Sequence, residues 1–251
     1  MCQDEASEKT GLLLDKCSFE PSAEFMILKD EAEISVNNDY SLRFDRHVTY
    51  KFFKEKKIDK QIAESIFYPS PFFEKYYRLS IRTVELDPTS KALIPRDHSS
   101  KITSTHIEQM GIKVKAGALL EVSYSLNFPY DEKVPDWRFQ SICPTETSSI
   151  KIITPEQVQL KETLESPYDG IEIHHNDESA KLFRLNNQNL TLRISERSYQ
   201  LSQLPSALAE SFADHWQGSA RMHMHIVSIT KGADVKEGFV EGQIQRIVET
   251  L

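Results

Sequence analysis

The segment from Leu119 to Phe128 alternates strictly between apolar and polar side chains along most of its length. One set of positions is apolar and the other polar: Leu120, Val122, Tyr124, Leu126 and Phe128 against Glu121, Ser123, Ser125 and Asn127. Neighbouring residues in a strand point to opposite faces, so this period of two is typical of a strand with one buried and one solvated face. The chain is therefore expected to build its core from antiparallel sheets.

The segment from Ser41 to Phe52 shows the same alternation, with apolar side chains at its even positions. Arg46 is the one even position that breaks this apolar face, and it predicts a bulge or an exposed end at that point. Asn37-Asn38-Asp39 precedes the segment, and these residue types favour a turn because they tolerate positive φ. The pattern predicts a hairpin with one dry and one wet face.

Further short segments with strand character follow along the chain and predict an all-β protein with antiparallel β-sandwich architecture in two packed parts. The strands are expected over residues 76–86, 92–94, 101–107, 112–114, 149–153, 158–164, 171–174, 181–185, 190–195 and 221–230. The expected organisation is a flexible N-terminal tether (1–20), a first β-sandwich part (21–155), a second β-sheet part (156–234) and a short C-terminal helix (235–251). Within the tether, Leu12-Leu13-Leu14 is the one apolar anchor.

Composition excludes several classes of function. The 251 residues carry a net charge of -8 with Lys and Arg scattered, so the basic patch of a nucleic-acid-binding protein is missing. Hydrophobic content of 39% and charged content of 27% are ordinary for a globular protein. No apolar run approaches the roughly 20 residues of a membrane-spanning helix, so no transmembrane segment is expected.

The three cysteines give no sign of a metal site or a catalytic nucleophile. Cys2, Cys17 and Cys143 form no C-x-x-C pair, which excludes zinc-ribbon and thioredoxin-like motifs. Cys143 precedes a proline at the entry to a predicted strand, and it lacks the loop-and-helix setting of a papain-type cysteine. We expect Cys143 to be a small buried hydrophobic side chain rather than a nucleophile.

Histidines and aromatic residues offer two further candidate sites. His223 and His225 would share one strand face and, with one of His174 and His175, would offer ligands to a metal, but no carboxylate stands at a ligand offset. We expect a wet sheet face there, and no cofactor or metal. A second set of side chains would form an aromatic platform for sugar or peptide, although packing between sheets is favoured for it: Trp137, Phe139, Tyr76 and Tyr77.

Several motifs, in their order along the chain, resemble one bacterial family. They are Phe25 to Glu31, Arg46-His47, Lys115 to Tyr124, Trp137-Arg138-Phe139-Gln140 with Pro144, Leu204 to Glu210, and Met222 to Ile229. This order is similar to that of the domain of unknown function found N-terminal to transglutaminase-like cysteine protease domains in secreted proteins. The resemblance covers residues 21 to about 230. No positions of this chain correspond to the Cys-His-Asp triad of the longer relatives, so their activity is not carried over.

The resemblance implies a non-catalytic, envelope-associated binding or scaffolding module whose partner is a transglutaminase-like or other envelope protein. The alternative is a free-standing β-sandwich that binds carbohydrate or peptide, and a hydrolase with an unrecognised site comes third. The compartment has two interpretations. If a signal preceded Cys2, that cysteine is the lipidation site of a periplasmic or cell-surface lipoprotein, since acidic residues follow it; if Met1 is the native start, the protein is cytoplasmic.

Overall fold

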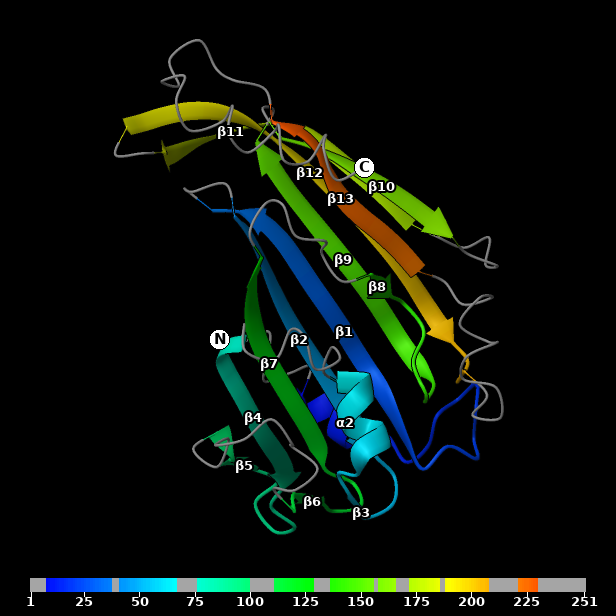
Figure 1. Ribbon diagram of the computed structural model, residues 1–251. Coiled ribbons are helices and arrows are strands. Elements are labelled where there is room, and N and C mark those ends of the chain that lie inside the picture. Colours follow the sequence, from blue (N-terminus) through cyan, green and yellow to red (C-terminus); the bar gives the residue numbers. More distant parts are fainter. Residues whose placement is uncertain are drawn as a thin grey trace.

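The computed structural model describes residues 8–37, 41–66, 76–99, 111–128, 136–155, 158–165, 172–185, 188–207 and 221–229 (Figure 1). The fold is predominantly β, which confirms the predicted fold class. The strands are β1 (Phe25–Val36), β2 (Leu42–Phe52), β3 (Lys56–Lys57), β4 (Tyr76–Leu86), β5 (Leu93–Asp97), β6 (Lys113–Val114), β7 (Leu119–Phe128), β8 (Trp137–Arg138), β9 (Thr145–Pro155), β10 (Val158–Glu165), β11 (Glu172–Leu185), β12 (Gln188–Leu204) and β13 (Arg221–Ile229). Helix α2 (Lys60–Ile66) and a helical turn at residues 8–12 complete the described elements.

Eight strands form one large sheet in the order β11-β12-β9-β1-β2-β7-β4-β5. The predicted hairpin of β1 and β2 is present, with Val36 opposite Leu42. The sheet is mixed rather than wholly antiparallel, because β1 and β9 run parallel and begin at the same end, with Ile27 opposite Thr145. The chain reaches β9 only after it has left the large sheet for β8, and such a crossover is what a parallel neighbour requires.

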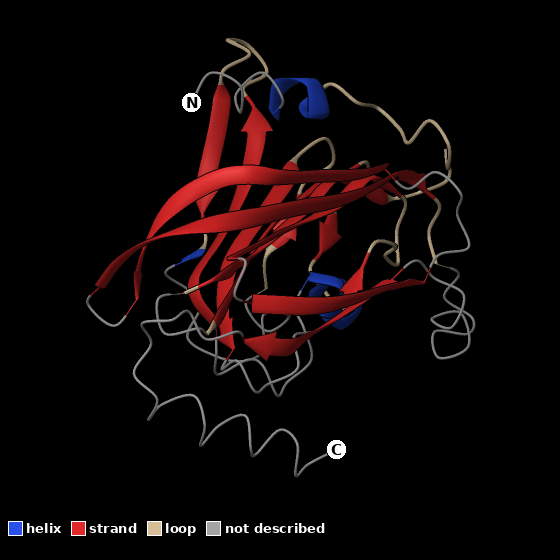
Figure 2. Ribbon diagram, turned by 90° about the horizontal axis from the view of Figure 1, so that it is seen from above, coloured by secondary structure: helices blue, strands red, loops and turns tan. Residues whose placement is uncertain are grey.

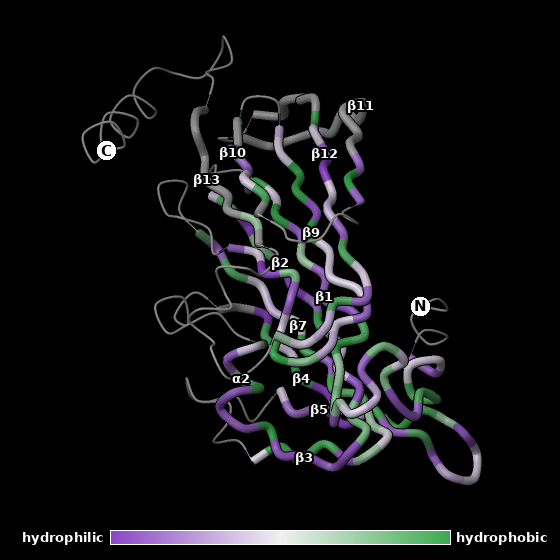
Figure 3. Tube along the Cα trace, turned by 90° about the vertical axis from the view of Figure 1, so that its right-hand side faces the viewer, coloured by the Kyte–Doolittle hydropathy of each residue, from purple (hydrophilic) through white to green (hydrophobic). Residues whose placement is uncertain are grey.

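The large sheet is covered on both faces. Helix α2 and a three-stranded sheet of order β10-β13-β8 lie on one face, which we call the inner face, and the N-terminal segment lies on the other, outer face (Figures 2 and 3). The main hydrophobic core lies between the large sheet and these inner-face elements. Figure 3 shows how apolar and polar residues alternate along the strands that sandwich this core.

The two expected parts of the chain share the large sheet. It takes β1, β2, β4, β5, β7 and β9 from residues 21–155, and β11 and β12 from residues 156–234. The small sheet likewise joins β8 from the first part to β10 and β13 from the second. The expected C-terminal helix at 235–251 lies outside the described residues, as does the predicted strand at 101–107.

The N-terminal segment differs from the tether that its polar composition predicts. Residues 8–12 lie against the outer face, where Leu12 is buried beside Val84 and Leu119. Cys17 is also buried, and Glu20 accepts hydrogen bonds from the backbone and hydroxyl of Ser206. The physical reason is that the outer face of the sheet is not uniformly wet, since it carries an apolar patch that Leu12 covers.

Two turns beside the central strands have well-defined geometry. Gly117 has a φ of 82°, the left-handed conformation that glycine adopts readily, in the tight connection before β7. The carboxylate of Asp87 accepts hydrogen bonds from the backbone N–H groups of Thr89 and Ser90, which closes the turn after β4.

Candidate functional site

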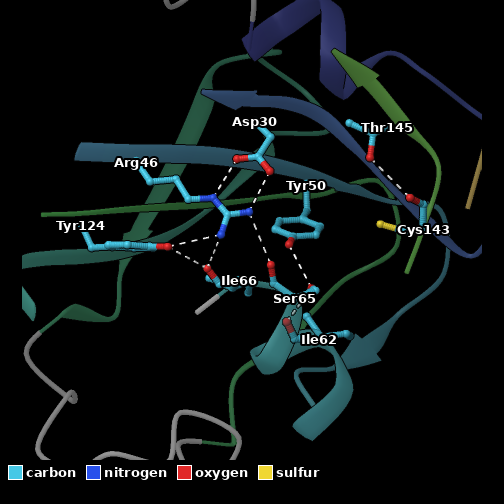
Figure 4. Close-up of polar contacts among 9 residues, drawn as sticks. All are labelled: Asp30, Arg46, Tyr50, Ile62, Ser65, Ile66, Tyr124, Cys143 and Thr145. Atoms are coloured by element: carbon cyan, nitrogen blue, oxygen red, sulfur yellow. Dashed lines mark hydrogen bonds and ion pairs between the residues drawn. The ribbon is translucent and has the colours of Figure 1, made fainter. Parts of the chain in front are cut away.

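The most concentrated set of polar contacts in the described interior centres on Arg46, which is only 8% exposed (Figure 4). Its guanidinium donates to both carboxylate oxygens of Asp30, from Nε at 2.8 Å and from Nη2 at 2.7 Å. This fork geometry is the strong, two-bond form of an arginine–carboxylate pair. The predicted bulge or exposed end at Arg46 is therefore wrong: β2 runs regularly there, and the charge is neutralised from β1.

The same guanidinium fixes the C-terminal end of helix α2. Arg46 Nη1 donates to the carbonyl of Ile66 at 2.7 Å, and the Tyr124 hydroxyl donates to the same carbonyl at 3.1 Å. The Tyr50 hydroxyl lies 3.1 Å from Ser65 Oγ one residue earlier. The last carbonyls of a helix have no partner within it, and a cation there is favourable. The network thus positions α2 on the inner face.

Trp137 belongs to this interior and not to a ligand platform. It is 1% exposed, its ring centroid lies 6.2 Å from that of Phe44, and Phe139 meets it edge-on at 6.3 Å. The guanidinium carbon of Arg46 lies 5.3 Å from the centre of the Trp137 ring, a cation–π distance. Trp137 therefore offers no face to a sugar or peptide. The side chains of Tyr76 and Tyr77 lie outside the described part, although their backbones belong to β4.

A second polar contact joins the large and small sheets. Glu162 of β10 pairs with Arg197 of β12 at 2.8 Å and accepts a hydrogen bond from the Tyr199 hydroxyl at 2.5 Å. Burial, with the neighbouring Glu162 carboxylate, raises the pKa of Tyr199. Like the Arg46 network, this contact holds elements together, and sequence reasoning missed it because its partners lie on strands distant in the chain.

The cysteines that the structure describes are buried thiols. Cys143 is free and buried at the entry to β9, and its burial raises the pKa of the thiol. Cys17 is also free and buried. Because the thiolate is the nucleophile, the raised pKa of Cys143 makes that residue a poor nucleophile. This placement agrees with the packing role expected for Cys143; Cys2 lies outside the described residues.

Both buried thiols are expected to be inert toward a thiol reagent in the native protein. In a Cys2→Ser background, neither thiol of the native protein should react quickly with Ellman's reagent at pH 8. Both should react after unfolding in guanidinium chloride. The measurement is absorbance against time in the two conditions. Rapid native-state labelling of Cys143, identified by peptide mass, would contradict a purely structural role for that residue.

The histidines are spread over two sheets. His223 and His225 lie on β13, opposite Thr163 and Lys161 of β10, whereas His174 is exposed on β11 at the edge of the large sheet. The side chains of His223, His225 and His175 lie outside the described part. Among the side chains that the structure does describe, no group of three His, Cys, Asp or Glu residues is placed to hold a metal ion.

The outer face carries two exposed leucines, among them the most exposed large apolar side chain of the described residues, and sequence reasoning did not place them there. We call residues 8–14 the N-terminal strap. Within the strap, the Leu12 side chain is buried against the sheet, while Leu13 and Leu14 are 70% and 39% exposed. The strap is held at one end by Glu8, which pairs with Arg82 at 2.6 Å. The Leu12-Leu13-Leu14 run was its signal in the sequence.

The strap is also fixed by a buried lysine. Lys51 of β2 reaches the outer face, where its ammonium donates to the carbonyl of Leu12 at 2.7 Å and to that of Gly117 at 2.7 Å. Desolvation lowers the pKa of Lys51 to about 8, although nearby Asp15 acts in the opposite direction. Gly11 has no side chain, and this lets the strap approach Leu28 and Leu119 closely. A Cβ added at this position would come 2.6 Å from Leu28 Cδ1.

The fold is similar to that of solved structures. The chain resembles a crystal structure described as a putative protease from Parabacteroides distasonis ATCC 8503, with a TM-score of 0.50 and 15% sequence identity. The match covers 80% of this chain and 40% of that one, so it spans less than half the length of the structural neighbour. At this identity the likeness concerns the fold alone. No family model matches the chain, and no curated protein matches it significantly in sequence.

Among the residues described, none of the helices is long and apolar enough to cross a bilayer.

Proposed function

We propose that this chain is a non-catalytic binding or scaffolding module of the bacterial envelope, and that it works beside a protease domain of the transglutaminase-like kind. Two lines support the proposal. The fold resembles part of a longer protein described as a putative protease. The buried polar groups at Arg46 and at Glu162 are engaged in holding helix and sheets together. In this proposal Cys2 is the lipid-bearing residue that keeps the module at the envelope.

The observation that carries the binding role is the exposed pair Leu13 and Leu14 on a strap that is itself fixed. An exposed apolar pair lowers solubility, so it is a candidate contact surface. Leu12 and Lys51 hold the strap in place, so less conformational entropy is lost when a partner binds. The carbohydrate alternative has lost its strongest support, because Trp137 is buried.

Substituting the exposed pair tests the proposal. A tagged wild type is expected to capture, from native envelope extract of the source bacterium, a protein with a protease domain identified by mass spectrometry. The Leu13→Gln/Leu14→Gln variant should capture at least about tenfold less, since a few anchoring side chains dominate most interfaces. Its melting temperature should stay unchanged, because both side chains face solvent.

Ile173→Gln is the matched control, since Ile173 is 47% exposed but lies on β11, at the far end of the sheet from the strap (Figure 1). This variant should capture as much as the wild type. Capture of no protein by the wild type, or equal capture by the Leu13→Gln/Leu14→Gln variant, would refute the proposed binding surface.

A further inference from the structure

The two edges of the large sheet are built differently. At one edge lies β5, which is short and carries Pro95 with exposed Arg96 and Asp97. A short strand with proline and charges is how proteins protect an edge from pairing. At the other edge lies β11, with 14 residues and neither proline nor glycine. Within the described residues β11 has β12 as its single sheet neighbour.

Strand β11 is polarised in charge along its length. Its first half carries Glu172, Asp177 and Glu178, and its second half carries Lys181 and Arg184. If a second copy of the strand pairs with it in antiparallel orientation, the acidic half of each copy lies opposite the basic half of the other. A parallel arrangement would place like charges opposite each other, which is destabilising. The charge pattern therefore selects an antiparallel copy of itself as the partner.

The change of charge sign between Glu178 and Lys181 locates the centre of such a pairing, at the start of the regular part of the strand. The ladder with β12 is irregular between Asn176 and Ser179, and it is regular from Ser179 to Leu185. This regular stretch is as long as a typical strand. A two-fold axis near Ser179 and Ala180 would bring the Asp177-Glu178 segment of each copy opposite the Lys181 region of the other.

We propose that two copies of this chain associate through antiparallel pairing of β11 with β11 about a two-fold axis near Ser179 and Ala180. The contact is isologous, closes after two copies and joins the two large sheets into one continuous sheet. Backbone hydrogen bonds supply the attraction, and the acidic and basic halves set the direction. The inference rests on the sheet topology and the sequence of β11, and it is independent of the strap on the outer face.

Charge reversal tests this pairing without assuming its register. The acidic variant is Lys181→Glu/Arg184→Glu, and the basic variant is Glu172→Lys/Asp177→Lys/Glu178→Lys. By sedimentation equilibrium at roughly 100 µM, a concentration at which a micromolar contact is occupied, the wild type should have twice the chain mass. Each variant alone should be monomeric, and an equimolar mixture should recover the doubled mass.

A wild type that is monomeric throughout, variants that dimerise as the wild type does, or a mixture that stays monomeric would each overturn the proposal. Disulfide cross-linking between two copies tests the same contact without reversing the charges of β11. Ala180→Cys in a Cys2→Ser background should form an intermolecular disulfide, whereas Arg96→Cys on the β5 edge should not. Equal cross-linking at both positions would count against the β11 contact as well.

Discussion

Replacing Arg46 with methionine is expected to lower the free energy of unfolding by about 3–5 kcal/mol. The substitution leaves the Asp30 carboxylate buried at 2% exposure without its bidentate partner, and it removes a donor from the final carbonyl of α2. An uncompensated buried charge is among the few changes that cost this much. Urea denaturation followed by tryptophan fluorescence measures the loss.

Arg43→Met is the matched control on the same strand. Arg43 pairs with Asp45 at 2.7 Å, but about a third of each side chain is exposed, so this change is expected to cost less than about 1 kcal/mol. Asp30→Leu combined with Arg46→Met should recover part of the loss, because no buried charge remains. A cost for Arg46→Met as small as that of the control would contradict the buried pair.

The second prediction concerns the pH dependence that Lys51 confers on stability. The folded protein releases the Lys51 proton at a pKa of about 8, whereas the unfolded chain holds it up to the ordinary value of 10.5. Between these values the unfolded state binds more protons, so the unfolding free energy must rise with pH. The cost of keeping Lys51 charged is complete below pH 8 and is relieved as the pH approaches 10.5.

Lys51→Met isolates this effect. The difference in unfolding free energy, wild type minus variant, is expected to grow by about 1–2 kcal/mol from pH 7 to pH 10, after allowance for solvent screening. The wild type must be compared with the variant because other groups also change stability with pH. Burial raises the pKa of Tyr50, Tyr199 and Cys143, so their ionisation makes the unfolding free energy fall as the pH rises. Lys57→Met, at an exposed lysine, is the control and should show no trend. A pH-independent difference for Lys51→Met would argue against a desolvated ammonium.

The sequence predicts most of the central strands because their signal is local. Alternation over β2 and β7 reflects the burial of one face, and the apolar positions of both strands are indeed buried. Arg46 was misread because its partner lies on another strand. Asp30 interrupts the apolar face of β1 as Arg46 interrupts that of β2, and in the hairpin Ala32 lies opposite Arg46, so the two charges are diagonal neighbours. Two charged interruptions of opposite sign in a predicted hairpin are the signal that would have found the pair.

Features set by distant parts of the chain could not be predicted in this way. The parallel pairing of β1 with β9 depends on the path of the chain between the two strands, and the periodicity of apolar residues carries no information about that path. The same holds for the strap, because the Leu12-Leu13-Leu14 run predicts an apolar anchor, but the patch at Val84 and Leu119 that Leu12 covers is known only from the fold. Burial of Trp137 was favoured from packing arguments, while its cation–π contact with Arg46 required the fold.

The most direct test of the central claim, that this chain is a binding module whose contact surface is the strap, is a dissociation constant. It is measured by biolayer interferometry between the purified chain and the protease-domain protein that it captures. We predict saturable binding by the wild type and by Ile173→Gln, and at least about tenfold weaker binding by Leu13→Gln/Leu14→Gln, a loss of about 1.4 kcal/mol or more. Equal dissociation constants for all three proteins would contradict the account.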